Sequence, residues 1–415
     1  MRSIIKHPEL AEEGKIRVDW AEQHMPALKL IVDEYKDEKP LKDLKISACL
    51  HVTKETGVLI KSLHQLGAEV NLAASNPLTT QDDVAAYLAQ IGINVFAWRG
   101  EKENEYFSMI KKILEFNPDI VIDDGGDLHV MLHEEERKRA MKILGGTEET
   151  TTGVIRLKAL EKMEKLLYPV IAVNNAETKR MFDNKYGTGQ STMDGIMRAT
   201  SLLLAGKKVV VCGYGWVGRG IASRARGLGA HVIVTEVDPI KAIEALLDGF
   251  EVMSINEAAE KGDIFITATG QINVIRGEHM VKMKNGAILA NSGHFNVEVS
   301  IEDLEKMSVS KRKIRKNVDE YVLKNGKKLY LLGEGRLINL VAAEGHPPEV
   351  MMCSFSNQLL SIIYISKNHD KLTKKVYNVP RSIDKKVAEY ILKAWNVKID
   401  ELIEEQVRYA KSWRW

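Results

Sequence analysis

Short polar segments follow several predicted strands, and they carry side chains that can transfer protons. Histidine occurs in HVTKE at 51–55, carboxylates occur in DDGGD at 123–127 and EETTTG at 148–153, and lysine occurs in TKRMFDN at 178–184. Groups of these types can serve as general acids and bases on a bound small molecule. Because parallel strands present ligand sites at their carboxyl ends, we expect chemistry at this edge of a sheet. Each segment taken alone also has an ordinary structural interpretation, as a core histidine or a charged turn.

A glycine-rich segment, GYGWVGRG at 213–220, predicts a dinucleotide site because it follows the apolar strand 208–212 and opens a helix. In such a loop the first glycine makes the tight turn, the second lets backbone approach a pyrophosphate, and the third lets helix pack on strand. A second strand, 231–235, ends at Glu236, where an acid would bind the ribose of NAD. A carboxylate there disfavours the 2′-phosphate of NADP, although Lys241 weakens this preference. We therefore predict NAD, with contacts at Gly213, Gly215, Trp216, Val217, Gly218, Glu236 and Lys241.

Strand-like and helix-like segments alternate along the chain, which is the pattern of an α/β fold with parallel sheets. The first series begins near residue 44 and includes the apolar strand 120–122, and the second begins at residue 208, after a long helix predicted at 191–204. We therefore predict two doubly wound parallel-sheet domains, one of them a Rossmann domain, and a helical tail. The predicted units are a substrate-binding domain at 1–186 that is completed by 347–381, an NAD-binding domain at 187–346, and an oligomerisation tail at 382–415.

Length and composition narrow the class of protein. A chain of 415 residues exceeds the size at which one core keeps growing, which favours two domains. The 59 basic and 57 acidic residues leave a net charge of +2, so we expect a small-molecule partner and neither nucleic acid nor an anionic membrane. The sequence has no run long enough for a membrane helix and no export signal, so we predict a cytoplasmic protein. Three scattered cysteines, Cys49, Cys212 and Cys353, predict neither a disulfide framework nor a metal site.

Two further segments, NSGHF at 291–295 and the stretch 339–347, complete a set of motifs. In order and spacing over nearly the whole chain, these segments closely resemble the S-adenosyl-L-homocysteine hydrolase family, with ETTTG at 149–153 and GHP at 345–347 specific in combination. The resemblance implies NAD-dependent, reversible hydrolysis of S-adenosyl-L-homocysteine to adenosine and L-homocysteine. In this family tightly bound NAD oxidises the 3′-carbon of the ribose, and the resulting ketone acidifies the 4′-hydrogen. Homocysteine is then eliminated, water adds to the enone and the hydride returns, so that no net redox change occurs.

The resemblance also implies roles for the polar side chains. Lys179 with Asp183 would manage the proton of the 3′-hydroxyl, which requires a lysine pKa lowered by burial beside the positive nicotinamide. Asp124 would remove the 4′-hydrogen, and His51 and His294 would handle the water and the departing thiolate. Without the family pattern, an isolated histidine would more often be structural and a lone lysine would be solvated. The implied catalytic residues are His51, Asp124, Glu149, Lys179, Asp183 and His294.

Binding positions are implied in the same way. Glu149 would bind ribose hydroxyls, and backbone near Gly345 and His346 would read the purine edge. The threonines at 150–152 would contact the nucleotide and could also cap the helix that follows. The implied substrate contacts are Thr53, Glu55, Asp124, Glu149, Lys179, Asp183, His346 and Met351, and the implied cofactor contacts outside the glycine loop are Thr150, Thr151, Thr152, Asn184, Gly293, His294, Asn339 and His346.

The chain departs from the family pattern at several positions. Many members have a cysteine at the position of Thr188, so that thiol would tune the cofactor without being required. Lys241 replaces an asparagine near the adenosine ribose, and Glu344 replaces a methionine beside the base. A carboxylate near the purine could change which base is accepted, so adenine is expected and hypoxanthine, as S-inosyl-L-homocysteine, stays open. The family implies a homotetramer, but the tail to Trp415 lacks the basic extension that reaches a neighbour's NAD in many relatives, so we expect it to form a dimer contact instead.

Two other classes of protein share parts of these signals. An NAD-dependent hydroxy-acid dehydrogenase would have the same Rossmann domain and a two-domain cleft, but it would release NADH during turnover. A regulatory relative would keep the fold without the chemistry, and the intact lysine, aspartates and histidines argue against it. For the hydrolase we also expect the domains to close on substrate, because a reactive ketone must be shielded from water.

Overall fold

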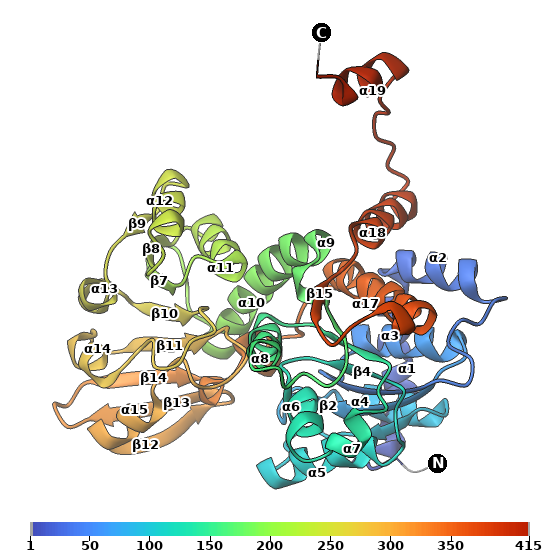
Figure 1. Cartoon of the computed structure of the whole chain (residues 1–415). Helices are drawn as coiled ribbons and strands as arrows, with labels where there is room; N and C mark the ends of the chain where they lie inside the picture. The colour runs from blue at the N-terminus through green and yellow to red at the C-terminus, as the bar shows by residue number, and fades with distance from the viewer. Residues whose placement is uncertain (1–2, 414–415) are drawn as a thin grey trace.

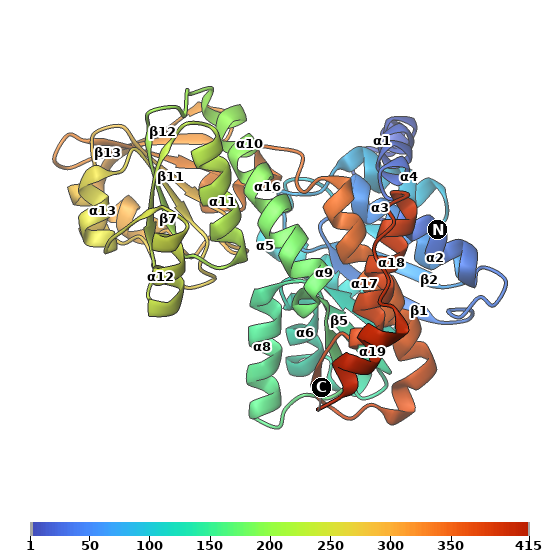
Figure 2. The ribbon, with the colours of Figure 1, turned by 90° about the horizontal axis from the view of Figure 1, so that it is seen from above.

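The computed structural model describes residues 3–413 and contains two lobes, each built on a largely parallel sheet that helices cover (Figures 1 and 2). Within these residues the first sheet has seven strands in the order β15-β6-β5-β4-β1-β2-β3, and the second has eight in the order β12-β13-β14-β11-β10-β7-β8-β9. The described pairs are parallel except for β12 with β13 and β13 with β14, which are antiparallel. The predicted α/β class with two sheet domains is therefore confirmed.

Apolar runs form the centre of the first sheet. β4 (Ile120–Asp123) and β1 (Lys45–Leu50) lie side by side in parallel, with Cys49 opposite Asp123. Both strands are almost completely buried because helices cover the two faces, as is usual for parallel sheets. The other strands of this sheet are β2 (Glu69–Ala74), β3 (Asn94–Phe96), β5 (Gly145–Glu148), β6 (Val170–Ala172) and β15 (Val376–Asn378).

Two helices of the first lobe begin inside the polar segments at the strand ends. Thr53 caps α3 (Lys54–Gln65) by accepting a hydrogen bond from the backbone N of Thr56. Thr150 caps α8 (Thr151–Lys162) in the same way, so the predicted capping role of this threonine is confirmed. The other helical elements of this lobe are η1 (Pro8–Leu10), α1 (Ala11–Gln23), α2 (Pro26–Tyr35), α4 (Asp82–Gln90), α5 (Glu103–Leu114), α6 (Asp127–Glu134), α7 (Arg137–Ala140), η2 (Val173–Asn175), α17 (Pro348–Asn368) and η5 (His369–Lys371).

The second lobe contains the predicted strand, glycine loop, helix and strand in that order. β7 (Lys208–Cys212) leads into α11 (Trp216–Gly227), and β8 (His231–Thr235) returns beside β7 in parallel. Its other strands are β9 (Glu251–Val252), β10 (Ile264–Thr267), β11 (Ala287–Asn291), β12 (Ser308–Arg315), β13 (Val318–Leu323) and β14 (Lys328–Leu332), and its other helical elements are α12 (Pro239–Leu247), α13 (Ile255–Lys261), α14 (Gly277–Lys282), α15 (Ile301–Met307), η4 (Gly333–Gly335) and α16 (Ile338–Val341).

A long helical segment connects the lobes. It starts as α9 (Glu177–Lys179), continues as the π-helix η3 (Arg180–Gly187), and runs into the second lobe as α10 (Thr188–Thr200) (Figure 2). The π-helix packs against α17 of the first lobe and α11 of the second. π-Helices are rare and occur frequently at functional sites. The domain boundary that we predict near residue 187 coincides with the end of this element.

The C-terminal tail differs in part from the prediction of a helical segment over 382–415. The structure has α18 (Arg381–Ala394) and α19 (Glu404–Lys411), joined by residues 395–403, which are not helical (Figure 1). After α18 the backbone of Asn396 adopts a φ of +54°, a left-handed conformation that ends helices. Residues 414 and 415 of the predicted tail lie outside the described part of the chain. No helix within residues 3–413 is long and apolar enough to cross a membrane.

Candidate active site

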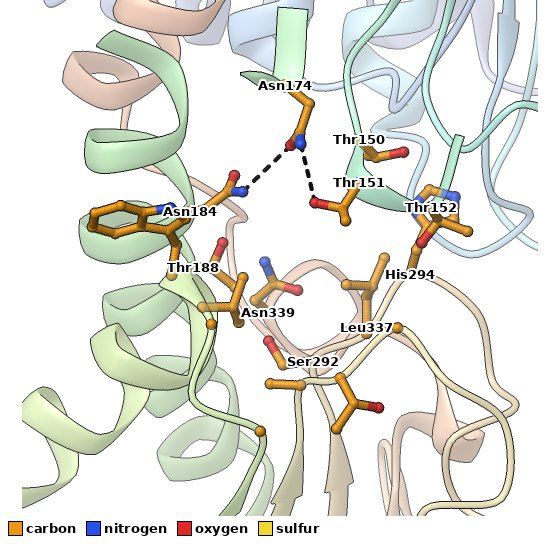
Figure 3. Close-up of a pocket in the computed structure, with 18 of the residues that line it drawn as sticks. Thr150, Thr151, Thr152, Asn174, Asn184, Thr188, Ser292, His294, Leu337 and Asn339 are labelled. Atoms are coloured by element: carbon orange, nitrogen blue, oxygen red, sulfur yellow. Dashed lines mark hydrogen bonds between the residues drawn. The ribbon is translucent and has the colours of Figure 1, made fainter. Parts of the chain in front are cut away.

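A cavity of about 930 Å³ opens where the two lobes meet. Its walls come from the carboxyl ends of strands in both sheets and from the helical segment that connects them. In Figure 3, Thr151 and Asn174 of the first lobe lie across the cavity from Ser292 and Leu337 of the second. A ligand in this cavity would therefore contact both lobes at once.

Neighbouring strands bring the polar segments of the first lobe together. β4 and β5 pair in parallel with Asp123 opposite Glu148, so the residues that follow these strands, Asp124 and Glu149, both line the cavity. β1 lies on the other side of β4, and His51 directly follows it. Adjacent strand ends thus place one histidine and two carboxylates at the same edge of the sheet, as the sequence predicted.

Glu148 ties two of these strand ends to each other. Its Oε1 accepts hydrogen bonds from the backbone N of Gly125 at 3.0 Å and from the backbone N and Oγ1 of Thr150, both at 2.8 Å. The side chain is fully buried, and burial, together with the nearby Asp123 carboxyl, raises the pKa of Glu148 well above its usual range. Sequence reasoning assigned no role to this residue, because its partners are set by the pairing of β4 with β5.

Lys179 lies at the centre of a carboxylate cluster. Its Nζ is 2.8 Å from Asp183 Oδ2 and 3.6 Å from Glu149 Oε1, and it donates a hydrogen bond to Asn184 Oδ1 at 2.8 Å. Burial alone would lower the pKa of Lys179, but the charges of Asp183 and Glu149 outweigh burial and raise it. The two carboxylates thus oppose the lowering of the pKa that we expect from burial beside the positive nicotinamide, and that expectation stays a prediction.

Glu149 has partners that the sequence did not reveal. Ser354 Oγ donates a hydrogen bond to Glu149 Oε1, and Gln358 Nε2 donates to Oε2 at 2.6 Å. Both donors belong to α17, where their spacing of four residues places them on one face of the helix. Burial, partly offset by Lys179, raises the pKa of Glu149 to about 7. This carboxyl is therefore suited to exchange a proton near neutral pH.

Two imidazoles flank Asp124. The distance from His51 Nε2 to Asp124 Oδ2 is 3.6 Å, that from His294 Nδ1 to Asp124 Oδ1 is 3.8 Å, and the two ring centres are 5.9 Å apart. Burial lowers the pKa of His51 to about 3 and that of His294 to about 4, and it raises the pKa of Asp124. Their ligand atoms lie within 4.8 Å of one another, a spacing that could also hold a metal ion. The expectation that the protein uses no metal therefore stays a prediction.

His346 connects the second lobe to Asp183. Its Nδ1 lies 2.5 Å from Asp183 Oδ1, and its Nε2 lies 3.1 Å from the hydroxyl of Thr188, the residue that stands where many relatives have cysteine. Burial would lower the pKa of His346, but the Asp183 carboxylate raises it. Asp183 is thereby shared between Lys179 and His346, which come from different segments of the chain.

The glycine loop has the geometry that a dinucleotide requires. Gly213 adopts a φ of +98°, which a side chain would strain, and a methyl group on Gly218 would sit 1.9 Å from Gly213 O. At Gly215, by contrast, a side chain would meet no atom within 4 Å, so the backbone there is open to a ligand. Glu236 accepts a hydrogen bond from the backbone N of Tyr214 at 2.6 Å and lines the cavity. These residues fit an NAD molecule bound at the start of α11.

The structure gathers almost all of the predicted site residues in one place. Gly218 is the exception within residues 3–413, because it packs against Gly213 below the loop, the role expected of the third glycine. The predicted residues that line the cavity are His51, Thr53, Glu55, Asp124, Glu149, Thr150, Thr151, Thr152, Lys179, Asp183, Asn184, Gly213, Gly215, Trp216, Val217, Glu236, Lys241, Gly293, His294, Asn339, His346 and Met351.

Asn174 is a cavity residue that the sequence analysis missed. Its amide Nδ2 donates to Thr151 Oγ1 at 3.1 Å, and its Oδ1 accepts from Asn184 Nδ2 at 3.4 Å (Figure 3). Its Oδ1 is also 3.5 Å from Lys179 Nζ. The available signal was its place just after the apolar segment 170–173, because the other polar segments also follow apolar segments.

Glu344 is neutralised by cations of the first lobe. Its Oε2 lies 2.7 Å from Arg17 Nη2 and 3.4 Å from Lys54 Nζ, and Lys54 Nζ is also 3.1 Å from Glu55 Oε1. Glu344 is not among the described residues that line the cavity, whereas Glu55 is. The expected addition of charge beside the base is therefore reduced by ion pairing.

The fold and the site define an NAD-dependent α/β enzyme in which one lobe has the dinucleotide-binding loop and titratable side chains of both lobes line the shared cavity. Comparison with known sequences identifies its family. Residues 2–144 match S-adenosyl-L-homocysteine hydrolase, and residues 184–345 match the S-adenosyl-L-homocysteine hydrolase NAD binding domain. The chain belongs to the S-adenosyl-L-homocysteine hydrolase family, which confirms the resemblance and the NAD cofactor.

The chain aligns with individual relatives over nearly the whole length of both sequences. Adenosylhomocysteinase from Sulfurisphaera tokodaii is 61% identical over 411 residues, which cover 99% of each chain. S-inosyl-L-homocysteine hydrolase from Methanocaldococcus jannaschii is 55% identical over 405 residues, which cover 98% of this chain and 97% of that one. The solved structure of a dipicolinate synthase chain from Bacillus halodurans has a TM-score of 0.50 at 15% identity and covers 78% of this chain and 99% of that chain. That last similarity concerns the fold alone.

Proposed function

We propose that the protein catalyses the NAD-dependent, reversible hydrolysis of S-adenosyl-L-homocysteine to adenosine and L-homocysteine. The observation that carries this proposal is the gathering of Lys179, Glu149 and Asp124 in the cavity that the glycine loop also enters. Such a set can act on a hydroxyl proton and on an adjacent carbon-bound proton of one sugar. The relative named adenosylhomocysteinase, 61% identical, supports the same reaction.

The pyrophosphate and one ribose of the cofactor would be bound by the glycine loop and the end of β8, and the other predicted cofactor contacts line the same cavity. Backbone at Gly215 and the start of α11 would face the pyrophosphate, and Glu236 would accept hydrogen bonds from a ribose. Lys241 Nζ lies 3.7 Å from Asp238 Oδ2, which offsets the positive charge that would otherwise favour NADP. Bound NAD would supply the hydride acceptor for the 3′-carbon of the substrate.

Lys179 and Glu149 would act on the 3′-hydroxyl. With its pKa raised, Lys179 is an ammonium that donates a hydrogen bond to the 3′-oxygen and orients it. Glu149, with a pKa of about 7, lies 3.6 Å from Lys179 Nζ and can take up the hydroxyl proton that Lys179 relays. Burial opposes the charge of Asp183, but His346 and Lys179 lower its pKa, so Asp183 stays ionised and fixes Lys179 in place.

Asp124 would remove the 4′-hydrogen once the 3′-carbon is a ketone. Burial raises the pKa of this carboxyl, which makes it a stronger base than an exposed aspartate. His51 and His294, on either side of it, are neutral because burial lowers the pKa of each, so they can accept a proton from water or relay one to the departing thiolate. The three groups would thus carry out elimination and water addition at the same carbon pair.

A hydroxy-acid dehydrogenase and a regulatory relative would differ from the hydrolase in the release of NADH and of thiol. A hydroxy-acid dehydrogenase has no need for Asp124, His51 and His294 around a sugar, and it would accumulate NADH in solution. A hydrolase of this mechanism shows no net change in NADH absorbance while thiol appears. A regulatory relative without chemistry would release no thiol from the thioether.

The nucleobase is tested with two substrates. Purified protein is offered S-adenosyl-L-homocysteine and S-inosyl-L-homocysteine, and the homocysteine thiol is measured over time, with Asp124→Asn as the inactive control. We expect faster release from the adenosyl compound, because the charge of Glu344 is paired with Arg17 and Lys54. Faster release from the inosyl compound would assign the protein to the activity named for the Methanocaldococcus jannaschii relative. Release from neither would refute the proposed reaction.

We propose a cytoplasmic homotetramer. The described cysteines Cys49, Cys212 and Cys353 are buried and form no disulfide within residues 3–413, as expected for a reducing compartment. Ile399, Leu402 and Ile403, around the start of α19, are exposed in the single chain and could be covered by a neighbouring copy of the chain. Light scattering should give four times the chain mass of 46.6 kDa, and a lower mass after removal of residues 395–415 would support contact through the tail.

A further inference from the structure

His51 has a buried partner that its place in the cavity does not require. Its Nδ1 lies 2.8 Å from Thr79 Oγ1, while its Nε2 faces Asp124 at 3.6 Å. Thr79 belongs to the loop between β2 and α4 and is 3% exposed. This hydroxyl is therefore placed to decide which ring nitrogen of His51 carries the proton.

The hydroxyl of Thr79 also lies 3.2 Å from the backbone carbonyl of Asn76. A hydroxyl has a single proton, and a carbonyl oxygen can only accept one. If Thr79 donates to Asn76, its oxygen must accept from His51 Nδ1–H, and every group in this short chain is satisfied. In the reverse arrangement, the Asn76 carbonyl would keep only the backbone N of Thr79 at 3.4 Å, and a proton on His51 Nε2 would point at Asp124 across 3.6 Å, too far for a hydrogen bond.

We propose that Thr79 is a positioning residue that fixes neutral His51 in the tautomer protonated on Nδ1, so that the lone pair of Nε2 faces the cavity and accepts a proton during the water-addition step. The pKa of His51, lowered to about 3 by burial, agrees with a neutral ring. The proposal rests on the proposed function for the identity of the proton donor, but the tautomer itself does not depend on it.

The protons balance if His51 serves the water and Asp124 serves the sugar carbon. Asp124 takes the 4′-hydrogen as the C5′–S bond breaks and the thiolate leaves. Water then forms the C5′–O bond while one of its O–H bonds breaks and the proton passes to His51 Nε2, and Asp124 returns its proton to C4′. His51 finally gives its proton to the thiolate, which restores both side chains and completes addition of water across the thioether.

The experiment compares three variants of the full-length holoenzyme. Thr79→Val removes the acceptor at nearly constant shape, and Thr79→Ser restores it. Thr80→Val is the matched control, because Thr80 is adjacent and fully buried and its hydroxyl has no hydrogen-bond partner within the described chain. We expect Thr79→Val to lower kcat for homocysteine release by about tenfold or more with KM nearly unchanged, and Thr79→Ser and Thr80→Val to stay within about twofold of the parent.

Two readouts separate positioning from damage to the fold. In a single turnover, the transient absorbance of enzyme-bound NADH should still appear in Thr79→Val, because oxidation at the 3′-carbon precedes the step that uses His51. In the parent holoenzyme labelled with ¹⁵N-histidine, nuclear magnetic resonance should show Nδ1 of His51 protonated and Nε2 unprotonated. A proton on Nε2, or parental kcat in Thr79→Val, would overturn the inference. Failure of the parent to release homocysteine from either thioether would instead refute the proposed function and leave the tautomer measurable.

Discussion

The imidazole of His294 rests directly on the backbone of Gly125, so that a methyl group on the Cα of Gly125 would sit 2.1 Å from His294 Nε2. Gly125 belongs to the first lobe and follows Asp124, whereas His294 comes from the second lobe. The backbone of Gly125 also has a φ of +108°, which side chains rarely adopt. This position therefore has two independent requirements for glycine, one conformational and one steric, and the steric one concerns the contact between the lobes.

Gly125→Ala should lower kcat for homocysteine release by about tenfold or more, because His294 must move away from Asp124. Gly92→Ala is the matched control: Gly92 has a φ of +98°, but a side chain there would meet no atom within 4 Å. Gly92→Ala should cost about 1 kcal/mol in free energy of unfolding through backbone strain, and Gly125→Ala should cost more because the added methyl group also displaces His294. Equal kcat values for the two variants would show that the contact with His294 has no catalytic consequence.

Replacement of Lys179 should separate catalysis from cofactor binding. Lys179→Ala should slow homocysteine release by roughly 10²–10⁴-fold, since it removes the ammonium that we propose to orient the 3′-hydroxyl and to relay its proton. NAD content of the purified protein should be nearly unchanged, because the glycine loop lies in the other lobe. Lys162→Ala, an exposed lysine at the end of α8, serves as the control. A parental rate in Lys179→Ala would reject its role.

Glu148 should matter as a hydrogen-bond acceptor. Glu148→Gln keeps an oxygen for Gly125 and Thr150 and should retain kcat within about threefold. Glu148→Ala leaves one buried donor, the N of Gly125, and two partly buried donors of Thr150 without their acceptor, and it leaves a cavity beside them. The free energy of unfolding should therefore fall by about 2–4 kcal/mol, and kcat should fall as well because Asp124 and Glu149 lose their alignment. Urea unfolding and thiol release are measured in parallel for both variants. A larger loss of stability or of kcat in Glu148→Gln than in Glu148→Ala would refute the prediction.

Part of the site could be read from the sequence because it depends on local pattern. The glycine loop, its strands and Glu236 lie within a single continuous segment. The polar segments can be recognised because each of them follows an apolar strand. The positions of Asp124 and Glu149 in one cavity then follow from the rule that parallel strands end at a common edge.

The rest depends on contacts between distant residues. Ser354 and Gln358 reach Glu149 from α17, and Thr79 reaches His51 from the next strand end, with nothing in the local sequence to single them out. The effect of Asp183 and Glu149 on the pKa of Lys179 could not be predicted either, because the balance between burial and two carboxylates needs actual distances. The break between α18 and α19 was missed, since residues 395–403 continue the apolar and charged composition of a helix.

A pH dependence of stability should arise from Glu101, outside the cavity. This carboxyl is 6% exposed, its Oε1 accepts from the backbone N of Trp98 at 3.1 Å, and burial raises its pKa to about 8. Between the ordinary glutamate pKa and about 8, the folded chain keeps a proton that the unfolded chain releases. The contribution of Glu101 to the free energy of unfolding is therefore full below the ordinary pKa and is lost as pH rises through about 8.

Glu101→Gln keeps a neutral side chain at every pH and should abolish this loss. Its stability relative to the parent should improve between about pH 5 and 8 by on the order of a few kcal/mol. Glu103→Gln, an acid in the first turn of α5 for which no such burial is found, provides the comparison. Parallel pH profiles for Glu101→Gln and the parent would contradict the prediction.

The π-helix between residues 180 and 187 also limits how this sequence can change. Each α-helical residue turns the chain by about 100°, and the backbone hydrogen bonds of a π-helix span one residue more than those of an α-helix. Deleting or inserting one residue here would swing the whole NAD-binding lobe around the helix axis and carry Gly213 away from Asp124. Surface loops can gain or lose residues without such an effect. We therefore expect single-residue insertions and deletions to be tolerated in surface loops and to abolish activity in residues 180–187.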